Sequence, residues 1–482
     1  MHSTRSLLAL GSLVGLASLG LTACAPTPVT FECLDDDPLC SLAENLETLP
    51  PAVSVDIQAI ALYQTAEKVL MEDGEAVDDG LSVAEGRDAL LRVFLSPADT
   101  YEERDLAVRA LIYQGEDLVD AVMVKEAFLG GGDWDDLGST FNLEIPGRSI
   151  GSDFGLVVEV LESQGEVSFP GIQGLNTWPE EGWAAVETTR TGPLRILMVP
   201  IQYDADGSGR LPNTSDEEMD RFAADFYAHY PATEVEIEVT EPYSTANGIR
   251  NGGFSGLLNE VTAQRDALGA DPDQYVYGIF DPGSDPTGGT AGLCWVGGVM
   301  VCIGLTGQTG TAIHEVGHAH GRLHSPGCGA GDPDPAYPES DGTLGTRAYN
   351  SYLGTLYGST EAYDFMSYCG PTFTSAHTWE SLVTRVKGIN DTLASYGQES
   401  IEWQMLFVDA AGNSELGGRS WYAQAPAGQA VHVLLLDADG VVLSRADAVL
   451  NEQDHALGSM LRVPAWVDLD GVERVQVVSL QQ

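Results

Sequence analysis

Four of the nine histidines of this 482-residue chain lie within one short segment, residues 314–324. If this segment is helical, His314 and His318 are one turn apart, and their imidazoles lie on the same face at about 6 Å. Two neutral imidazoles in that arrangement can bind one Zn²⁺ ion. Glu315 directly follows the first histidine, so its side chain can reach a water on the metal rather than the metal itself.

A glycine after the predicted helix brings a third histidine to the same point. Gly321 can adopt the left-handed conformation that ends a helix, so that the chain reverses and His324 approaches the metal from another side. Three protein ligands leave the fourth position for water, which is typical of a catalytic site. The sequence therefore predicts one catalytic Zn²⁺ held by His314, His318 and His324. His320 lies outside this set and is interpreted as a polar residue at the helix end.

The whole pattern HExxHxxGxxH resembles the zinc signature of the metzincin metallopeptidases. Metzincins also have a methionine in a tight turn beneath the zinc, and the segment YDFMSYC at residues 363–369 is similar to that turn. The resemblance implies that Glu315 is the general base and Met366 a hydrophobic floor. Tyr368 is similar to the tyrosine that astacins and serralysins place beside the zinc, which implies a second catalytic residue. The segments near Cys328 and Cys369 are similar to bacterial lipoprotein metzincins of the ToxR-regulated type.

The resemblance implies hydrolysis of peptide bonds in a protein or peptide substrate, glycoproteins included. Two alternatives stay open: a surface binding protein or adhesin with a vestigial metzincin domain, and a zinc hydrolase of a non-protein amide or ester. The intact Glu315 argues against the first alternative. In this family an extended substrate pairs with a sheet edge above the zinc, and the hairpin LCWVGGVMVC at residues 293–302 is a candidate for that edge. Stapling of this hairpin by a disulfide is the other interpretation.

Alternating strands and helices precede the histidine motif. Residues 194–203 have the pattern of a buried strand, and residues 215–230 have helical period, with a capping box that starts at Ser215. The same alternation continues to residue 281 and favours an α/β sheet. We therefore expect an α/β metzincin catalytic domain at residues 191–398, with a twisted mixed sheet and a zinc helix. The loop at residues 204–210 is superficially similar to a Ca²⁺ loop, although Ser215 replaces the glutamate that an EF-hand needs.

Short strands with period-two alternation flank this block on both sides. They predict an N-terminal β-sandwich accessory domain at residues 51–190 and a small C-terminal β domain, again sandwich-like, at residues 399–482. The predicted fold is thus multidomain, with an α/β catalytic domain between two all-β sandwich-like domains.

The N-terminus has the pattern of an export signal. One arginine within the first five residues precedes an apolar run at residues 7–23, which is short for a membrane-spanning helix. The run ends in LTAC, which resembles the bacterial lipobox, so Cys24 is the predicted lipid attachment site. We expect a signal peptide at residues 1–23, a tether at residues 24–50, and a protein anchored by lipid to the bacterial cell envelope, at the outer membrane or cell surface. Ordinary cleavage near Ala25 is the alternative.

Cysteine number and net charge limit the remaining possibilities. Of the seven cysteines, six remain when Cys24 is set aside as the predicted lipid attachment site. An even number of cysteines in a protein outside the cytosol favours disulfides, and the absence of any CxxC pair disfavours a zinc site made of cysteines. Proximity suggests the pairs Cys33–Cys40, Cys294–Cys302 and Cys328–Cys369. With 22 Lys+Arg against 72 Asp+Glu, the formal charge of −50 excludes nucleic acid as a natural partner.

Overall fold

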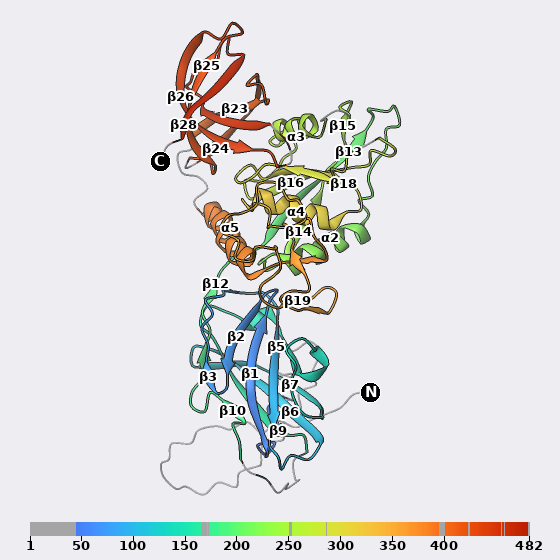
Figure 1. The fold of residues 1–482 in the computed structure, drawn as a ribbon, viewed down its shortest axis with the longest axis vertical. Coiled ribbons are helices and arrows are strands. Elements are labelled where there is room, and N and C mark those ends of the chain that lie inside the picture. The colour runs from blue at the N-terminus through green and yellow to red at the C-terminus, as the bar shows by residue number, and fades with distance from the viewer. Residues whose placement is uncertain are drawn as a thin grey trace, which may run out of the picture.

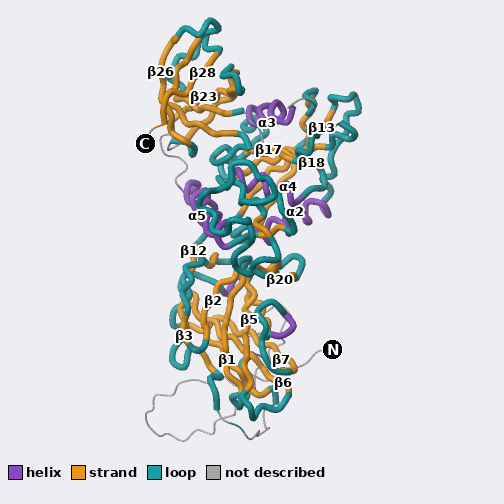
Figure 2. Tube along the Cα trace, in the orientation of Figure 1, coloured by secondary structure: helices purple, strands orange, loops and turns teal. Residues whose placement is uncertain are grey.

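The computed structural model describes residues 45–164, 171, 173–249, 253–285, 287–394, 401–422, 425–454, 456 and 458–480. They form three parts that follow one another along the longest axis of the molecule (Figure 1). The four helices α2–α5 lie in the central part, and strands make up most of the two end parts (Figure 2). The predicted signal peptide at residues 1–23 lies outside the described residues, and so does the part of the predicted tether that contains Cys24, Cys33 and Cys40.

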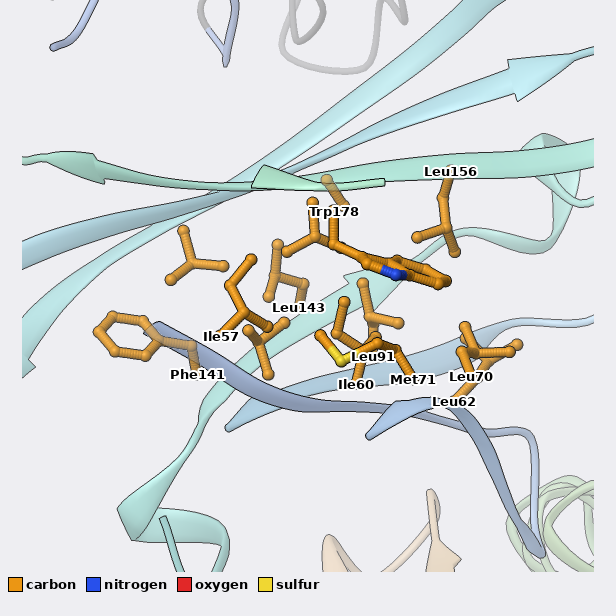
Figure 3. Close-up of a cluster of buried hydrophobic side chains, with 14 of the residues drawn as sticks. Ile57, Ile60, Leu62, Leu70, Met71, Leu91, Phe141, Leu143, Leu156 and Trp178 are labelled. Carbon is orange, nitrogen blue, oxygen red and sulfur yellow. The ribbon is translucent and has the colours of Figure 1, made fainter. Parts of the chain in front are cut away.

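Two β-sheets pack face to face in the N-terminal part. One has the strand order β3-β2-β1-β5-β8 and the other contains β10-β9-β6-β7. The strands are β1 (Val55–Tyr63), β2 (Glu67–Glu72), β3 (Glu75–Ala76), β5 (Ala89–Pro97), β6 (Arg104–Gln114), β7 (Asp117–Phe128), β8 (Phe141–Ile145), β9 (Phe154–Glu162) and β10 (Thr177–Trp178). Because alternate residues face inward, Leu91 and Leu143 of the first sheet share a core with Leu156 and Trp178 of the second (Figure 3).

A mixed sheet with the strand order β14-β13-β16-β18-β17 lies in the central part. Its strands are β13 (Leu194–Tyr203), β14 (Val235–Val239), β16 (Gln274–Phe280), β17 (Gly292–Cys294) and β18 (Val301–Leu305), and β15 (Tyr243–Thr245) also pairs with β13. Neighbouring strands are parallel except at one edge, where β17 runs antiparallel to β18. The helices are α2 (Asp216–His229), α3 (Gly253–Gln264), α4 (Thr309–Ala319) and α5 (Ala376–Ala394). Residues of α2, α4 and α5 share one apolar cluster with the sheet, and residues of α3 share another.

The predicted fold class, with an α/β metzincin catalytic domain between sandwich-like domains, is wrong. Strands make up 41% of the structure and helices 15%, with four helices in the described part and several antiparallel sheets. A helix separates β13 from β14 and another separates β15 from β16, but β16, β17 and β18 follow one another without a helix. After α4 the chain continues in loops and the short strands β19 (Ala348–Asn350), β20 (Thr355–Tyr357), β21 (Tyr363–Asp364) and β22 (Thr372–Phe373). The strand–helix alternation expected up to residue 281 is present, but beyond it the chain forms the antiparallel pair β17–β18, helix α4 and a run of loops and short strands.

The capping box predicted at the start of α2 is also not formed. Ser215 is the N-cap residue by its backbone conformation, but its side chain makes no capping hydrogen bond. Its carbonyl still accepts the first helical bond, from the Met219 N–H.

The C-terminal part is one six-stranded sheet instead of the expected sandwich, with the order β24-β23-β27-β26-β25-β28. Its strands are β23 (Ile401–Val408), β24 (Ser414–Tyr422), β25 (Gln429–Leu436), β26 (Val442–Glu452), β27 (Ser459–Pro464) and β28 (Arg474–Leu480). A bridge between Asn413 and Arg474 joins its two ends, so the sheet curls around its own core. Met405, Phe407 and Met460 instead belong to the apolar cluster of the central sheet, which docks the C-terminal sheet against it.

Candidate metal centre

Helix α4 carries the first part of the histidine motif, as predicted. Its apolar side chains pack into the cluster shared by the central sheet and α2, and they include Ala312, Ile313, Val316 and Ala319. This packing fixes the rotation of the helix and therefore the direction of His314 and His318. Gly321 has a φ of +87°, the left-handed conformation that ends the helix.

Backbone carbonyls orient the three predicted ligands His314, His318 and His324. Each imidazole has its Nδ1 within hydrogen-bond distance of a carbonyl oxygen, at 2.9, 2.7 and 2.8 Å respectively; the acceptors are Phe365, Arg322 and Gly331. Since a carbonyl can only accept, each Nδ1 carries the proton and each Nε2 becomes the ligand atom. The Nε2 atoms of His314 and His318 are 3.1 Å apart. Burial, with the neighbouring His318 as a second cause, holds the pKa of His314 well below its usual value, so this imidazole is neutral.

A fourth side chain, Asp454, completes the group, and nothing in the sequence pattern pointed to it. It lies in the turn between β26 and β27 of the C-terminal sheet. Its Oδ2 is 2.8 Å from His318 Nε2, and its Oδ1 is 3.4 Å from His324 Nε2. Burial raises the pKa of Asp454, but its contacts with His318 and His324 lower it more, so the net pKa is below its usual range. The carboxylate is therefore the ionised form, which can bind a cation.

The four side chains are placed to bind one metal ion. One ligand atom from each of His314, His318, His324 and Asp454 lies within 4.8 Å of all the others, and all four residues are buried. Three imidazoles and one carboxylate are a donor set that transition metals bind. Among the described residues no second group of this kind is found. In the loop at residues 204–210, which is superficially similar to a Ca²⁺ loop, Asp206 pairs with Arg210 at 2.7 Å.

Glu315 lies beside this group without belonging to it. Its side chain is 2% exposed, and its Oε2 has no hydrogen-bond partner. Burial raises the pKa of Glu315 well above its usual value, and the charge of Asp454 adds to this effect. β17 passes directly over the carboxylate, because a Cβ built on Gly292 would lie 2.7 Å from Glu315 Oε1. The edge strand of the central sheet therefore encloses this carboxyl group.

The turn that contains Met366 packs beneath α4. Met366 is buried, and a Cβ built on Gly317 of α4 would lie 2.5 Å from its Sδ atom. Asp364, which sequence analysis did not single out, stabilises the turn by accepting hydrogen bonds from the Met366 N–H at 2.9 Å and the Ser375 N–H at 3.0 Å. Gly317 is thus the residue that lets the turn approach the helix, and it occupies an unassigned position inside the histidine motif.

Tyr368 extends from the same turn to the metal centre. Its hydroxyl lies 3.1 Å from His324 Nε2, and its side chain is 43% exposed. The phenol is therefore close to a ligand atom and accessible from solvent, as a residue that meets a substrate must be. His320, in contrast, is buried and stacks on Tyr275 with a ring-centroid distance of 4.4 Å. It is the C-cap residue of α4, and burial lowers its pKa to about 3.

Two of the three expected disulfides are present, and the cysteines of the third, Cys33 and Cys40, lie outside the described residues. Cys294 and Cys302 join β17 to β18, and Cys328 and Cys369 join the segment after His324 to the end of the methionine turn. Disulfides of this kind indicate an oxidising compartment outside the cytoplasm. In the part of the chain that the structure describes, no helix has the length and apolar character needed to cross a bilayer.

Comparisons with known proteins add no family. No protein-family model and no curated protein matches this sequence. One similar solved structure is a chaperone–substrate complex, with 14% identity and a TM-score of 0.25, covering 52% of this chain and 39% of that chain. Another is a Paenibacillus cycloisomaltooligosaccharide glucanotransferase with bound cycloisomaltoheptaose, with 10% identity and a TM-score of 0.17, covering 89% of this chain and 72% of that one. TM-scores this low carry no argument about fold or function.

Removal of the second disulfide is expected to weaken both stability and metal binding. The bond closes a loop with a sequence separation of 41, so in the chain-entropy model the double variant Cys328→Ser/Cys369→Ser loses about 4 kcal/mol of unfolding free energy. The loop also contains Gly331, whose carbonyl orients His324, so the affinity for a metal ion is expected to fall as well. Calorimetry and competition with a chromophoric chelator measure the two effects.

The matched control removes the other bond. Cys294 and Cys302 are separated by 8 residues, so their double serine variant is expected to lose less, about 2.5 kcal/mol. Unchanged melting and unchanged metal affinity in the Cys328→Ser/Cys369→Ser variant would contradict the role given to this bond.

Proposed function

We propose that this protein is a zinc-dependent endopeptidase that acts outside the cytoplasm. The observation that carries the proposal is the pairing of a three-histidine ligand set with Glu315, a buried carboxyl group whose Oε2 has no hydrogen-bond partner. A buried polar atom without a partner costs about 1–3 kcal/mol, so its retention beside a metal-binding group favours a chemical role. The motif's resemblance to metzincin peptidases supports the same reaction class.

Zinc is the metal that the donor set favours. Three imidazole nitrogens and one carboxylate oxygen are typical zinc ligands, and hard cations such as Ca²⁺ and Mg²⁺ prefer sets made of oxygen atoms alone. The fixed Nδ1–H groups of His314, His318 and His324 match the arrangement in which outer hydrogen bonds orient zinc-binding imidazoles.

The chemistry that a bound zinc ion supplies is polarisation of a carbonyl and acidification of water. The positive charge of a bound zinc ion would favour the ionised form of Glu315. This carboxylate would then remove a proton from the attacking water, whose oxygen forms a bond to the scissile carbonyl carbon. The carbon–nitrogen bond then breaks, and Glu315 delivers the proton to the leaving amine. Burial beneath β17 keeps this carboxyl group away from bulk water.

Tyr368 is placed to stabilise the developing charge. Its hydroxyl lies 3.1 Å from the Nε2 of His324, on an accessible side chain. From there it donates a hydrogen bond to the oxyanion that forms on the substrate carbonyl. Preorganised donors of this kind are a large contribution to acyl-transfer catalysis.

A structural zinc site is the second candidate, and a specific observation favours it. The fourth position is taken by Asp454, and structural zinc sites are closed by four protein ligands. A structural site, however, has no use for Glu315 or for an accessible tyrosine at the ligand atoms. The vestigial adhesin and the hydrolase of a non-protein amide or ester remain alternatives that an assay with peptides separates from the proposal.

The cellular position of the enzyme is proposed from the N-terminal sequence. An apolar run followed by LTAC suits a lipoprotein signal, and lipidation of Cys24 would anchor the chain to the bacterial cell envelope. The two disulfides agree with export. Protein or peptide substrates, glycoproteins included, would then be met at the outer membrane or cell surface.

Substitution Glu315→Gln tests the general base. Asp454 lies at the metal centre, so the assay uses protein that carries Asp454→Ala. The double variant with Glu315→Gln is compared with the Asp454→Ala single variant, which is its parent. Zinc content should be unchanged, since Glu315 is not one of the four grouped side chains, and peptide turnover should fall about 10²–10⁴-fold. The exposed Glu217→Gln on α2 is the control and should keep full turnover. Undiminished hydrolysis in Glu315→Gln would sink the mechanism, and no zinc-dependent hydrolysis in the parent would sink the proposed function.

Tyr368→Phe, in the same background, separates catalysis from packing. The change keeps the ring and removes the hydroxyl, so kcat should fall about 10²–10³-fold while zinc content and melting temperature stay constant. Tyr352→Phe, at another exposed tyrosine, serves as the control. Full kcat in Tyr368→Phe would show that the hydroxyl has no catalytic role.

Lipid anchoring is tested at Cys24. The mature wild-type protein should partition into detergent, and its N-terminal peptide should carry acyl mass because the thiol is the attachment point. Cys24→Ser should release a soluble product or block processing. A wild-type mature chain that begins elsewhere and is found free in the medium would refute the anchor.

A further inference from the structure

The outer edge of the central sheet is filled by a segment of the C-terminal sheet. β17 is the last strand of its sheet, and the chain just after it pairs antiparallel with the turn that follows β26. The Val296 N–H donates to the Glu452 carbonyl at 3.0 Å, and the Asp454 N–H donates to the Cys294 carbonyl at 3.0 Å. Between these bonds Gln453 lies opposite Trp295. An extended peptide that adds a strand to a sheet edge makes backbone hydrogen bonds of the same kind.

This backbone pairing with the sheet edge fixes where Asp454 lies relative to the three histidines. Its backbone is fixed to Cys294, a residue tied by disulfide to β18, so the position of its Cα relative to α4 is determined. The side chain then reaches His318 at 2.8 Å and His324 at 3.4 Å. The same short segment thus occupies both the sheet edge and the open side of the three-histidine group.

Several contacts beyond the turn hold the segment in place. Asn451 is buried and donates through Nδ2 to the Val296 carbonyl at 3.2 Å, while Arg462 donates to Asn451 Oδ1 at 2.5 Å. Gln453 Nε2 donates to Asn259 Oδ1 on α3 at 3.0 Å. Beneath the turn, Met405, Phe407 and Met460 share an apolar cluster with Trp295. An intramolecular ligand anchored over such a surface competes at high effective concentration with any free peptide.

We propose that the turn between β26 and β27 is a built-in ligand of the metal centre, so that the folded chain is latent. Glu452, Gln453 and Asp454 pair with the sheet edge as an extended peptide would, and the Asp454 carboxylate takes the fourth position on the metal. The inference that the chain is latent rests on the proposed peptidase function. The inference that Asp454 occupies the fourth ligand position, which we call closure of the site, does not depend on that function. Access for a substrate then requires that this turn leave the edge.

Variants that remove or alter the Asp454 carboxylate test whether this side chain closes the site. Asp454→Ala removes the carboxylate and Asp454→Asn keeps its shape, whereas Glu452→Ala removes an exposed carboxylate from the same segment and is the matched control. Zinc affinity, measured against a chromophoric chelator, should fall at least about 10-fold in Asp454→Ala and stay unchanged in Glu452→Ala. In the Co²⁺-loaded protein, acetohydroxamate should shift the visible absorption bands of both Asp454 variants and leave those of the wild type and of Glu452→Ala unaltered.

Hydrolysis of a quenched peptide pool completes the test. Both Asp454 variants should cleave at least about 10-fold faster than the wild type when all are fully loaded with zinc.

An acetohydroxamate response in the wild type equal to that of Asp454→Asn would overturn the closure. Variants that bind acetohydroxamate but cleave no peptide would leave the closure standing and remove the latency together with the proposed function. Folded Asp454 variants that neither bind the probe nor cleave peptide would show a structural metal site and overturn the proposal.

Discussion

The metal centre depends on three hydrogen bonds from imidazole Nδ1 atoms to backbone carbonyls. These bonds turn the Nε2 atoms of His314, His318 and His324 toward one point. Each carbonyl belongs to a different segment: the methionine turn, the turn that ends the histidine helix, and the loop after the third histidine. The arrangement of the three Nε2 atoms therefore forms only when these segments are folded against α4. It depends on the folding of the whole central part of the molecule.

Close packing under α4 explains why those segments meet. Gly317 leaves room for Met366 and Phe365, since a Cβ at this position would lie within 2.7 Å of both side chains. The buried carboxylate of Asp364 holds the turn through two backbone N–H groups, and the Cys328–Cys369 bond ties the loop after His324 to the same turn. Each of these features limits how the turn can shift relative to the helix. Together they place the Phe365 carbonyl where His314 needs it.

Much of the candidate site could be predicted because it is local in sequence. Helical period fixes the relation of His314 to His318, and a glycine that permits left-handed backbone fixes the return to His324. Asp454 could not be predicted, because it reaches the site through strand pairing between two parts of the chain, and a single aspartate among many acidic residues has no distinguishing spacing. The α/β fold class was wrong because the strand–helix alternation that predicted it ends at β16 and does not extend to the loops and short strands that follow α4. In the C-terminal part, alternation with period two shows which side of a strand faces inward, but not whether a second sheet or the curl of the same sheet covers it.

Zinc-edge X-ray absorption on the full chain, combined with anomalous diffraction from its crystals, tests the central claim most directly. The account predicts one zinc ion among His314, His318, His324 and Asp454, with three imidazole nitrogens and one carboxylate oxygen at about 2.0–2.2 Å. A zinc ion bound elsewhere, or a first shell without three imidazoles, would contradict it.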